Sequence, residues 1–69
     1  MYDYTMLTQL IPVELLPTKN HHYQSLLVLF KDAQKHHLEY EVADSFTKAR
    51  RKGMTPMQSI DFAYNEWDL

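Results

Sequence analysis

Two pairs of adjacent histidines, His21-His22 and His36-His37, come nearest to a metal site in this sequence. Neighbouring residues of a helix point in different directions, so each pair offers one ligand to a shared ion. On one continuous helix the 15 residues between the pairs would span about 22 Å, which is too far for a common ion. Because zinc usually takes three or four ligands, we expect neither a metal site nor a cofactor.

Acid–base and nucleophilic catalysis have equally little support in the sequence. The closest carboxylate pairs are Glu39/Glu41 and Glu66/Asp68, but such catalysis needs a carboxylate in a pocket that shifts its pKa. A chain of 69 residues with short helices leaves little room for that pocket. The chain has no cysteine and one glycine, so it offers no thiolate nucleophile and no glycine-rich phosphate loop. We therefore expect that the protein is not an enzyme.

A run of cations closes the middle of the chain, at Lys48, Arg50, Arg51 and Lys52. Cations favour the carboxyl end of a helix, where the dipole is negative. The same side chains would suit phosphate groups or an acidic partner, so a small nucleic-acid-associated regulator is our alternative hypothesis. Nucleic acid is the disfavoured partner, however, because residues 56–67 carry acidic residues and no Lys or Arg, and phosphate would repel them.

Composition and hydropathy predict one folded domain over residues 1–69. The chain is 45% hydrophobic and 23% charged, with a net charge of −2, which is ordinary for a folded protein. No apolar run reaches the roughly 18 residues that cross a membrane. The first residues lack the basic and apolar regions of a signal peptide. We therefore expect a cytoplasmic protein without a membrane partner.

The elements that position these residues are predicted to be helices, because one glycine cannot supply the tight turns of an all-β fold. Apolar stripes at helical spacing predict a small all-α bundle with main helices over about 20–36, 38–52 and 56–67. Residues 1–19, punctuated by Pro12 and Pro17, form an amino-terminal arm or short helix, and 20–69 form the helical core. The stripes are Tyr23, Leu26, Leu27, Phe30, Ala33 and His37, then Leu38, Val42, Ala43, Phe46 and Ala49, then Met57, Ile60, Ala63, Tyr64 and Trp67.

Local signals place the ends of these helices. We expect Asn20 to be the N-cap of the first helix. We also expect a break near His36-His37, because on one continuous helix the first two stripes would be rotated by nearly half a turn from each other. One long helix with opposite apolar faces at its two ends is the alternative. Gly53 suits the left-handed residue that ends a helix. Thr55-Pro56-Met57-Gln58 predicts a capping box. The carboxyl-terminal half is therefore predicted to be a helix–turn–helix hairpin.

The amino-terminal arm has two readings. Asp3 can cap a helix over 4–11, followed by a single turn over 13–16. The competing picture is an extended arm, because the residue before each proline is pushed away from the helical region. In either case the apolar residues of the arm must pack on this chain or on another; they are Leu10, Ile11, Val13, Leu15 and Leu16.

The chain has more apolar side chains than a small monomer needs. Phe62 points roughly 160° away from the stripe of its own helix, and Val28 lies on the polar side of its helix. Helices with two apolar faces usually bury both. Either the amino-terminal arm covers Phe62 within the chain, or another chain does. We therefore expect a non-catalytic accessory, adaptor or inhibitor protein that binds itself, as a homodimer, or a larger protein. The candidate contact residues are Phe62, Trp67, Tyr64, Leu10, Ile11, Leu15, Leu16 and Val28.

Overall fold

The computed structural model describes the backbone of residues 4–69 and the side chains of residues 7–69. Along the described chain the elements are α1 (Tyr4–Leu10), the 3-10 turn η1 (Val13–Leu15), α2 (Asn20–Lys35), α3 (Glu39–Arg51) and α4 (Pro56–Glu66). This part of the chain has no strand, and the all-α prediction is confirmed. Each main helix agrees with its predicted range to within one residue at either end. Asp3, the predicted cap of the first helix, lies outside the described residues.

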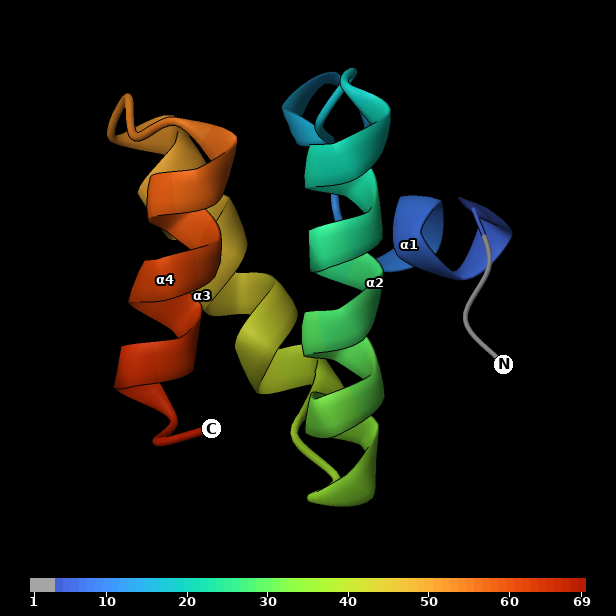
Figure 1. Ribbon diagram of the computed structural model, residues 1–69, viewed down its shortest axis with the longest axis vertical. Helices are drawn as coiled ribbons and strands as arrows, with labels where there is room; N and C mark the ends of the chain where they lie inside the picture. The colour runs from blue at the N-terminus through green and yellow to red at the C-terminus, as the bar shows by residue number, and fades with distance from the viewer. Residues whose placement is uncertain (1–3) are drawn as a thin grey trace.

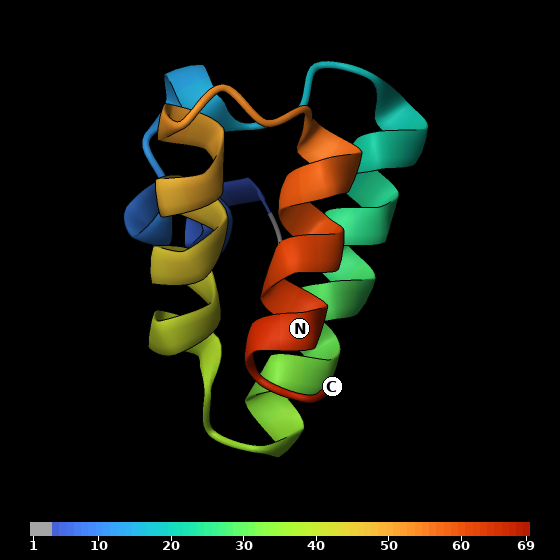
Figure 2. The same cartoon turned by 90° about the vertical axis from the view of Figure 1, so that its left-hand side faces the viewer.

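The three main helices form a bundle in which α3 and α4 are an antiparallel hairpin (Figures 1 and 2). Helix α2 packs on both and runs in the same direction as α4, so the amino ends of α2 and α4 share one end of the bundle. Helix α1 lies on the side away from α4 in both views, and η1 packs against α3. The predicted carboxyl-terminal hairpin is therefore confirmed.

The core draws on every helix and on the chain between α1 and α2. Its buried apolar residues are Leu7, Ile11, Leu16, Leu26, Leu29, Phe30, Ala33, Val42, Ala43, Phe46, Ala49, Ile60 and Ala63. Burying a leucine or isoleucine contributes about 1.5–3 kcal/mol, so the segment that holds Leu7, Ile11 and Leu16 is integral to the fold. The extended-arm alternative was wrong, because residues 4–10 and 13–15 are helical.

Three details of the predicted stripes were wrong or incomplete. His37 and Met57 are exposed, not buried, and Leu29 is fully buried although it was not assigned to the core. Leu29 is buried because α2 is covered by other elements over a wider arc than one stripe. His37 is exposed because α2 has already ended before it.

The break between α2 and α3 is confirmed, and it is built without glycine. His37 adopts a left-handed conformation with φ 57°. The N–H of Leu38 donates to the carbonyl of Ala33 (2.8 Å), and the N–H of His37 donates to that of Gln34 (3.1 Å). These two bonds are the Schellman motif that ends a helix. The chain therefore turns at the histidine pair, and α2 and α3 are separate helices.

The ends of α3 and α4 repeat this geometry. Gly53, at φ 97°, follows α3, and the N–H of Met54 donates to Ala49 O at 3.1 Å, as predicted. Asp68, at φ 55°, follows α4, and the N–H of Leu69 donates to Tyr64 O at 3.0 Å. Left-handed conformations suit glycine and are uncommon for other residues. In two of these three turns the left-handed position is therefore occupied by a residue other than glycine, His37 or Asp68.

The start of α4 has the predicted capping box, whereas the start of α2 differs from its prediction. Thr55 Oγ1 accepts from the N–H of Gln58 (3.1 Å), and Gln58 Oε1 accepts from the N–H of Thr55 (3.0 Å). At α2 the N-cap position belongs to Lys19, which makes no side-chain capping bond, and Asn20 is the first helical residue. The first turn already closes there, because Lys19 O accepts from the N–H of Tyr23 at 3.0 Å.

Candidate interaction surface

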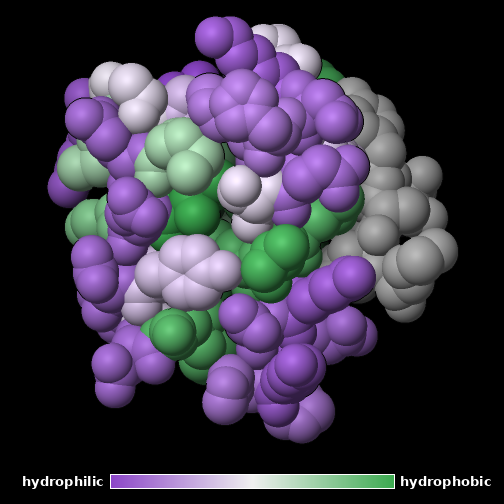
Figure 3. All heavy atoms as spheres, viewed as in Figure 1, coloured by the Kyte–Doolittle hydropathy of each residue, from purple (hydrophilic) through white to green (hydrophobic). Residues whose placement is uncertain are grey.

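An apolar band lies between α2 and α4 on the face drawn in Figure 3, with polar side chains around it. Two exposed apolar side chains belong to these helices: Val28 of α2 is 53% exposed and Met57 of α4 is 38% exposed. Tyr64, two turns after Met57 on α4, is half-buried against the core. We call the outer surface of α2 and α4, the helices that carry Val28, Met57 and Tyr64, the α2–α4 face.

Tyr64 links the two helices of this face. Burial raises the pKa of the Tyr64 phenol above its usual range, and the carboxylates of Asp32 and Asp61 raise the pKa further. Asp32 lies one helical turn after Val28, and Asp61 lies one turn before Tyr64. The phenol is therefore protonated at neutral pH and available as a hydrogen-bond donor at the junction of α2 and α4.

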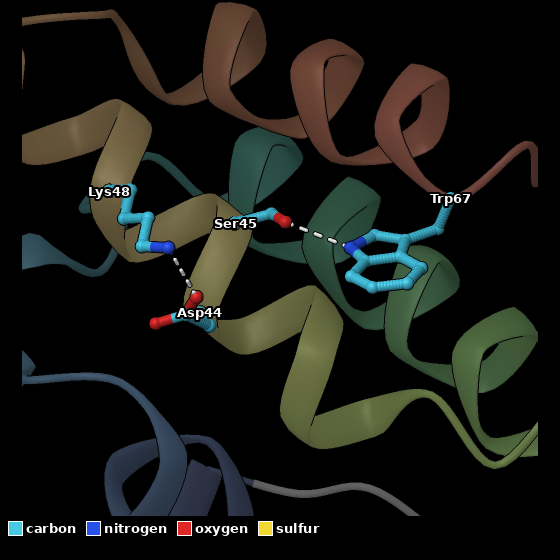
Figure 4. A network of polar contacts seen from close by, with 4 residues as sticks. All are labelled: Asp44, Ser45, Lys48 and Trp67. Atoms are coloured by element: carbon cyan, nitrogen blue, oxygen red, sulfur yellow. Dashed lines mark hydrogen bonds and ion pairs between the residues drawn. The ribbon is translucent and has the colours of Figure 1, made fainter.

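Trp67, at the end of α4, points back toward α3 (Figure 4). Its Nε1 donates a hydrogen bond of 2.8 Å to Oγ of Ser45, which is buried in the middle of α3. The Trp67 ring is half-buried and packs against the core. Trp67 was predicted as a contact residue for a partner, and the structure gives it a contact within the chain.

Phe62 is half-buried on α4 and is not among the described residues that form or pack against the core cluster. Helix α1 lies on the far side of the bundle from α4 (Figures 1 and 2). That helix therefore does not cover Phe62, and Phe62 remains a candidate contact residue outside the α2–α4 face.

The four candidates of the amino-terminal arm are not placed alike. Ile11 is 1% exposed and Leu16 is 6% exposed, so both are core residues and no longer belong to a candidate surface. Leu10 and Leu15 are half-buried and pack against the core. The excess of apolar residues at this end of the sequence is therefore largely absorbed by the fold itself.

Three exposed apolar side chains were missed as candidates: Tyr40, Val13 and Met57. Tyr40, in the first turn of α3, is 72% exposed. Val13 on η1 was expected to pack on this chain or on another, and it is 57% exposed, so it does not pack into the core of this chain. Tyr40 was overlooked because it lies among charged residues on the polar side of α3. Counting the apolar residues that fall off each stripe would have found it.

The basic run divides into structural and solvent-facing side chains. Arg50 Nε donates to Leu15 O (3.2 Å), and Arg50 Nη1 donates to Met54 O. The Arg50 guanidinium thereby ties η1 and the α3–α4 turn to the end of α3. Lys48 pairs with Asp44 at 3.0 Å (Figure 4), the i,i+4 ion pair that the sequence predicts. Of the four cations, Arg51 and Lys52 remain exposed without such contacts.

The histidine pairs lie at opposite ends of α2. The rings of His21 and His22 meet edge to face, with centroids 4.1 Å apart. Desolvation, His21 and Lys19, in that order, lower the pKa of His22. Among the described residues no three His, Asp or Glu side chains are close enough to hold a metal ion. Glu41, Glu66 and Asp68 are exposed to solvent.

Within residues 4–69 the structure encloses no pocket, and no helix there is long and apolar enough to cross a membrane. No family model matches the chain, and neither the curated proteins nor the solved structures gave a match to it. Its function is therefore argued from the surface alone.

Proposed function

We propose that this protein is a non-catalytic protein-interaction module that binds a second copy of itself or a larger protein through the α2–α4 face. One observation carries the proposal: Val28 and Met57 are exposed on two helices that pack against each other, and Tyr64, also on α4, is half-buried. Isolated exposed apolar residues are common on any protein, whereas an apolar patch rimmed by polar side chains is typical of an interaction site.

The construction of the face supports this proposal. Val28, Met57 and Tyr64 stand on helices that are held by the hydrophobic core, so little backbone entropy is lost when a partner binds. Tyrosine supplies a large contact area together with a polar group and is enriched at binding hot spots. As part of the same proposal we place the module in the cytoplasm, since a chain without cysteine needs no oxidising compartment.

The chain offers a matched pair of variants for testing this proposal. Val28→Asp places a charge on the α2–α4 face, and Val13→Asp places the same charge on η1 at a site of similar exposure. We expect Val28→Asp to abolish self-association or capture of a partner protein, while Val13→Asp retains it. Circular dichroism of both variants checks that the fold survives. Equal behaviour of the two folded variants would contradict the proposal.

A nucleic-acid regulator is the weaker candidate. It relies on Lys48, Arg50, Arg51 and Lys52, but Arg50 binds two carbonyl oxygens and Lys48 pairs with Asp44. Of these four cations, only Arg51 and Lys52 are exposed without such a contact; two cations neutralise few phosphates, and affinity for nucleic acid depends on that number. Salt-dependent binding of a DNA or RNA duplex, lost in the Arg51→Ala/Lys52→Ala variant, would reverse this order of preference.

A further inference from the structure

We propose that the occupant of the α2–α4 face is a second copy of this chain, packed so that α2 of each copy lies against α4 of the other. This inference rests on the proposed function and names its partner. Exposed apolar side chains and the charges that flank them on the two helices support this pairing.

The outer stripes of α2 and α4 have the same spacing and opposite charge. On α2 the pattern i, i+4, i+7, i+11 keeps four residues on one side of the helix, and on α4 the pattern i, i+4, i+7 keeps three. The α2 stripe carries an apolar residue and two cations, whereas the α4 stripe carries two apolar residues and one anion, with a second anion in the turn that follows the helix. The stripes are Gln24, Val28, Lys31 and Lys35 for α2, and Met57, Asp61 and Tyr64 for α4, with Asp68 in the left-handed turn after α4.

These charges form no ion pair among the described residues. Lys31, Lys35, Asp61 and Asp68 are all exposed. Among the described residues the ion pair found is that of Lys48 with Asp44, so none of the four flanking charges is neutralised by a salt bridge. Asp32, the anion of α2, and Asp61 of α4 both raise the pKa of the Tyr64 phenol of their own chain.

Charge selects the way in which two such faces meet. Packing α2 on α2 would oppose lysines with lysines, and packing α4 on α4 would oppose aspartates with aspartates. Like charges across an interface disfavour both of these arrangements. Packing α2 on α4 of the partner brings Lys31 and Lys35 toward Asp61 and Asp68. In a two-fold dimer each of these contacts forms twice.

The size of the face sets the expected affinity. Helix α2 has 16 residues, which span about 24 Å, and neighbouring helices lie about 9 Å apart. A face two helices wide therefore buries on the order of 400–500 Å² per copy, compared with about 800 Å² per partner in a standard interface. We expect a dimer with a dissociation constant in the micromolar range, weakened by salt.

Native mass across a series of protein concentrations tests the inference. Wild type is expected to pass from 8.3 kDa to about twice that mass as the concentration rises. Val28→Asp is expected to weaken the dimer by at least about tenfold and Val13→Asp by less than about twofold. Lys31→Glu and Asp61→Lys are each expected to weaken it by about tenfold, and the double variant K31E/D61K is expected to restore it.

The restored affinity of K31E/D61K is the decisive result, because a merely unfolded variant cannot be rescued by a second charge reversal. A mass of 8.3 kDa at every concentration overturns the inference, as does a dimer that Val28→Asp leaves intact. A monomer that captures a different protein in a Val28-dependent manner also overturns it, but leaves the proposed function standing. A monomer that captures no protein through Val28 overturns both.

Discussion

The indole of Trp67 and the hydroxyl of Ser45 are joined by a hydrogen bond of 2.8 Å between Nε1 and Oγ, across the interface of α4 and α3. The two residues are 22 positions apart in the sequence, and Ser45 is buried. Tyr64 lies one turn before Trp67 on α4. The bond that fixes the end of α4 therefore also fixes the position of Tyr64 on the α2–α4 face.

Ser45→Ala is expected to lower the free energy of unfolding by about 1–2 kcal/mol, because it removes the hydrogen-bond partner of the Trp67 N–H. Urea denaturation followed by tryptophan fluorescence measures the change, and Trp67 is the one tryptophan of the chain. Ser25→Ala is the control, since Ser25 bonds to the carbonyl of His21 on its own exposed turn. Equal losses in the two variants would show that the Trp67 bond contributes nothing.

His37→Gly is expected to raise the free energy of unfolding by about 1 kcal/mol, because His37 adopts a left-handed conformation that glycine adopts without strain. Thermal unfolding measures the gain. His36→Gly is the control and is expected to destabilise, since His36 has φ −106°. Gly53→Ala should destabilise by about 1 kcal/mol through the backbone alone, because an added Cβ meets no atom within 4 Å.

Arg50→Met is expected to lower the free energy of unfolding by about 1–3 kcal/mol, since it removes two hydrogen bonds from a charged group and keeps an apolar stem. The loss should concentrate in the amino-terminal segment, because Arg50 binds the carbonyl of Leu15. Proteolysis at residues 12–19 should accelerate. Arg51→Met changes an exposed cation of the same turn and should leave both measurements unchanged; a similar effect there would show that charge alone matters.

Asp32→Asn is expected to lower the pKa of Tyr64 toward its usual range, since Asp32 adds to the effect of burial on that phenol. Because the folded-state pKa is raised, the stability that Tyr64 supplies is complete below about pH 10 and declines as pH rises through the folded-state pKa. The variant should therefore lose less stability on going to alkaline pH. Tyrosinate absorbance measures the titration, and Asp44→Asn, remote from Tyr64, should leave it unaltered.

The helices and most of their ends could be predicted because each depends on neighbouring residues. The capping box of Thr55 and Gln58 and the left-handed turn at Gly53 are local chemistry, and both are found in the structure. The break at the histidine pair could be predicted because the apolar stripes of α2 and α3 would be rotated from each other on one continuous helix. Asn20 was misplaced by one residue because asparagine strongly favours the N-cap position, whereas here Lys19 occupies that position and Asn20 begins the helix.

Contacts between distant segments could not be predicted from local sequence patterns. Leu29 is buried because several elements surround α2, and no single stripe reports that. In the sequence, Ser45 resembles a residue of the polar face, and only the fold places Trp67 next to it. Likewise, Arg50 resembles one residue of a basic run, and only the fold places the carbonyl of Leu15 next to it. The candidate surface was partly wrong for the same reason. Ile11 and Leu16 were predicted as contact residues, but the amino-terminal segment packs on the bundle and buries both in the core.

The Arg50 clamp also has a consequence for the order in which the chain can fold during synthesis. Leu15 and Arg50 are 35 residues apart, so at about 5–20 residues per second the amino-terminal segment is synthesised roughly 2–7 s before Arg50. Throughout that interval Ile11 and Leu16 have no finished core to enter. Because transiently exposed apolar side chains promote aggregation, we expect the nascent chain to be most prone to aggregate before α3 is complete.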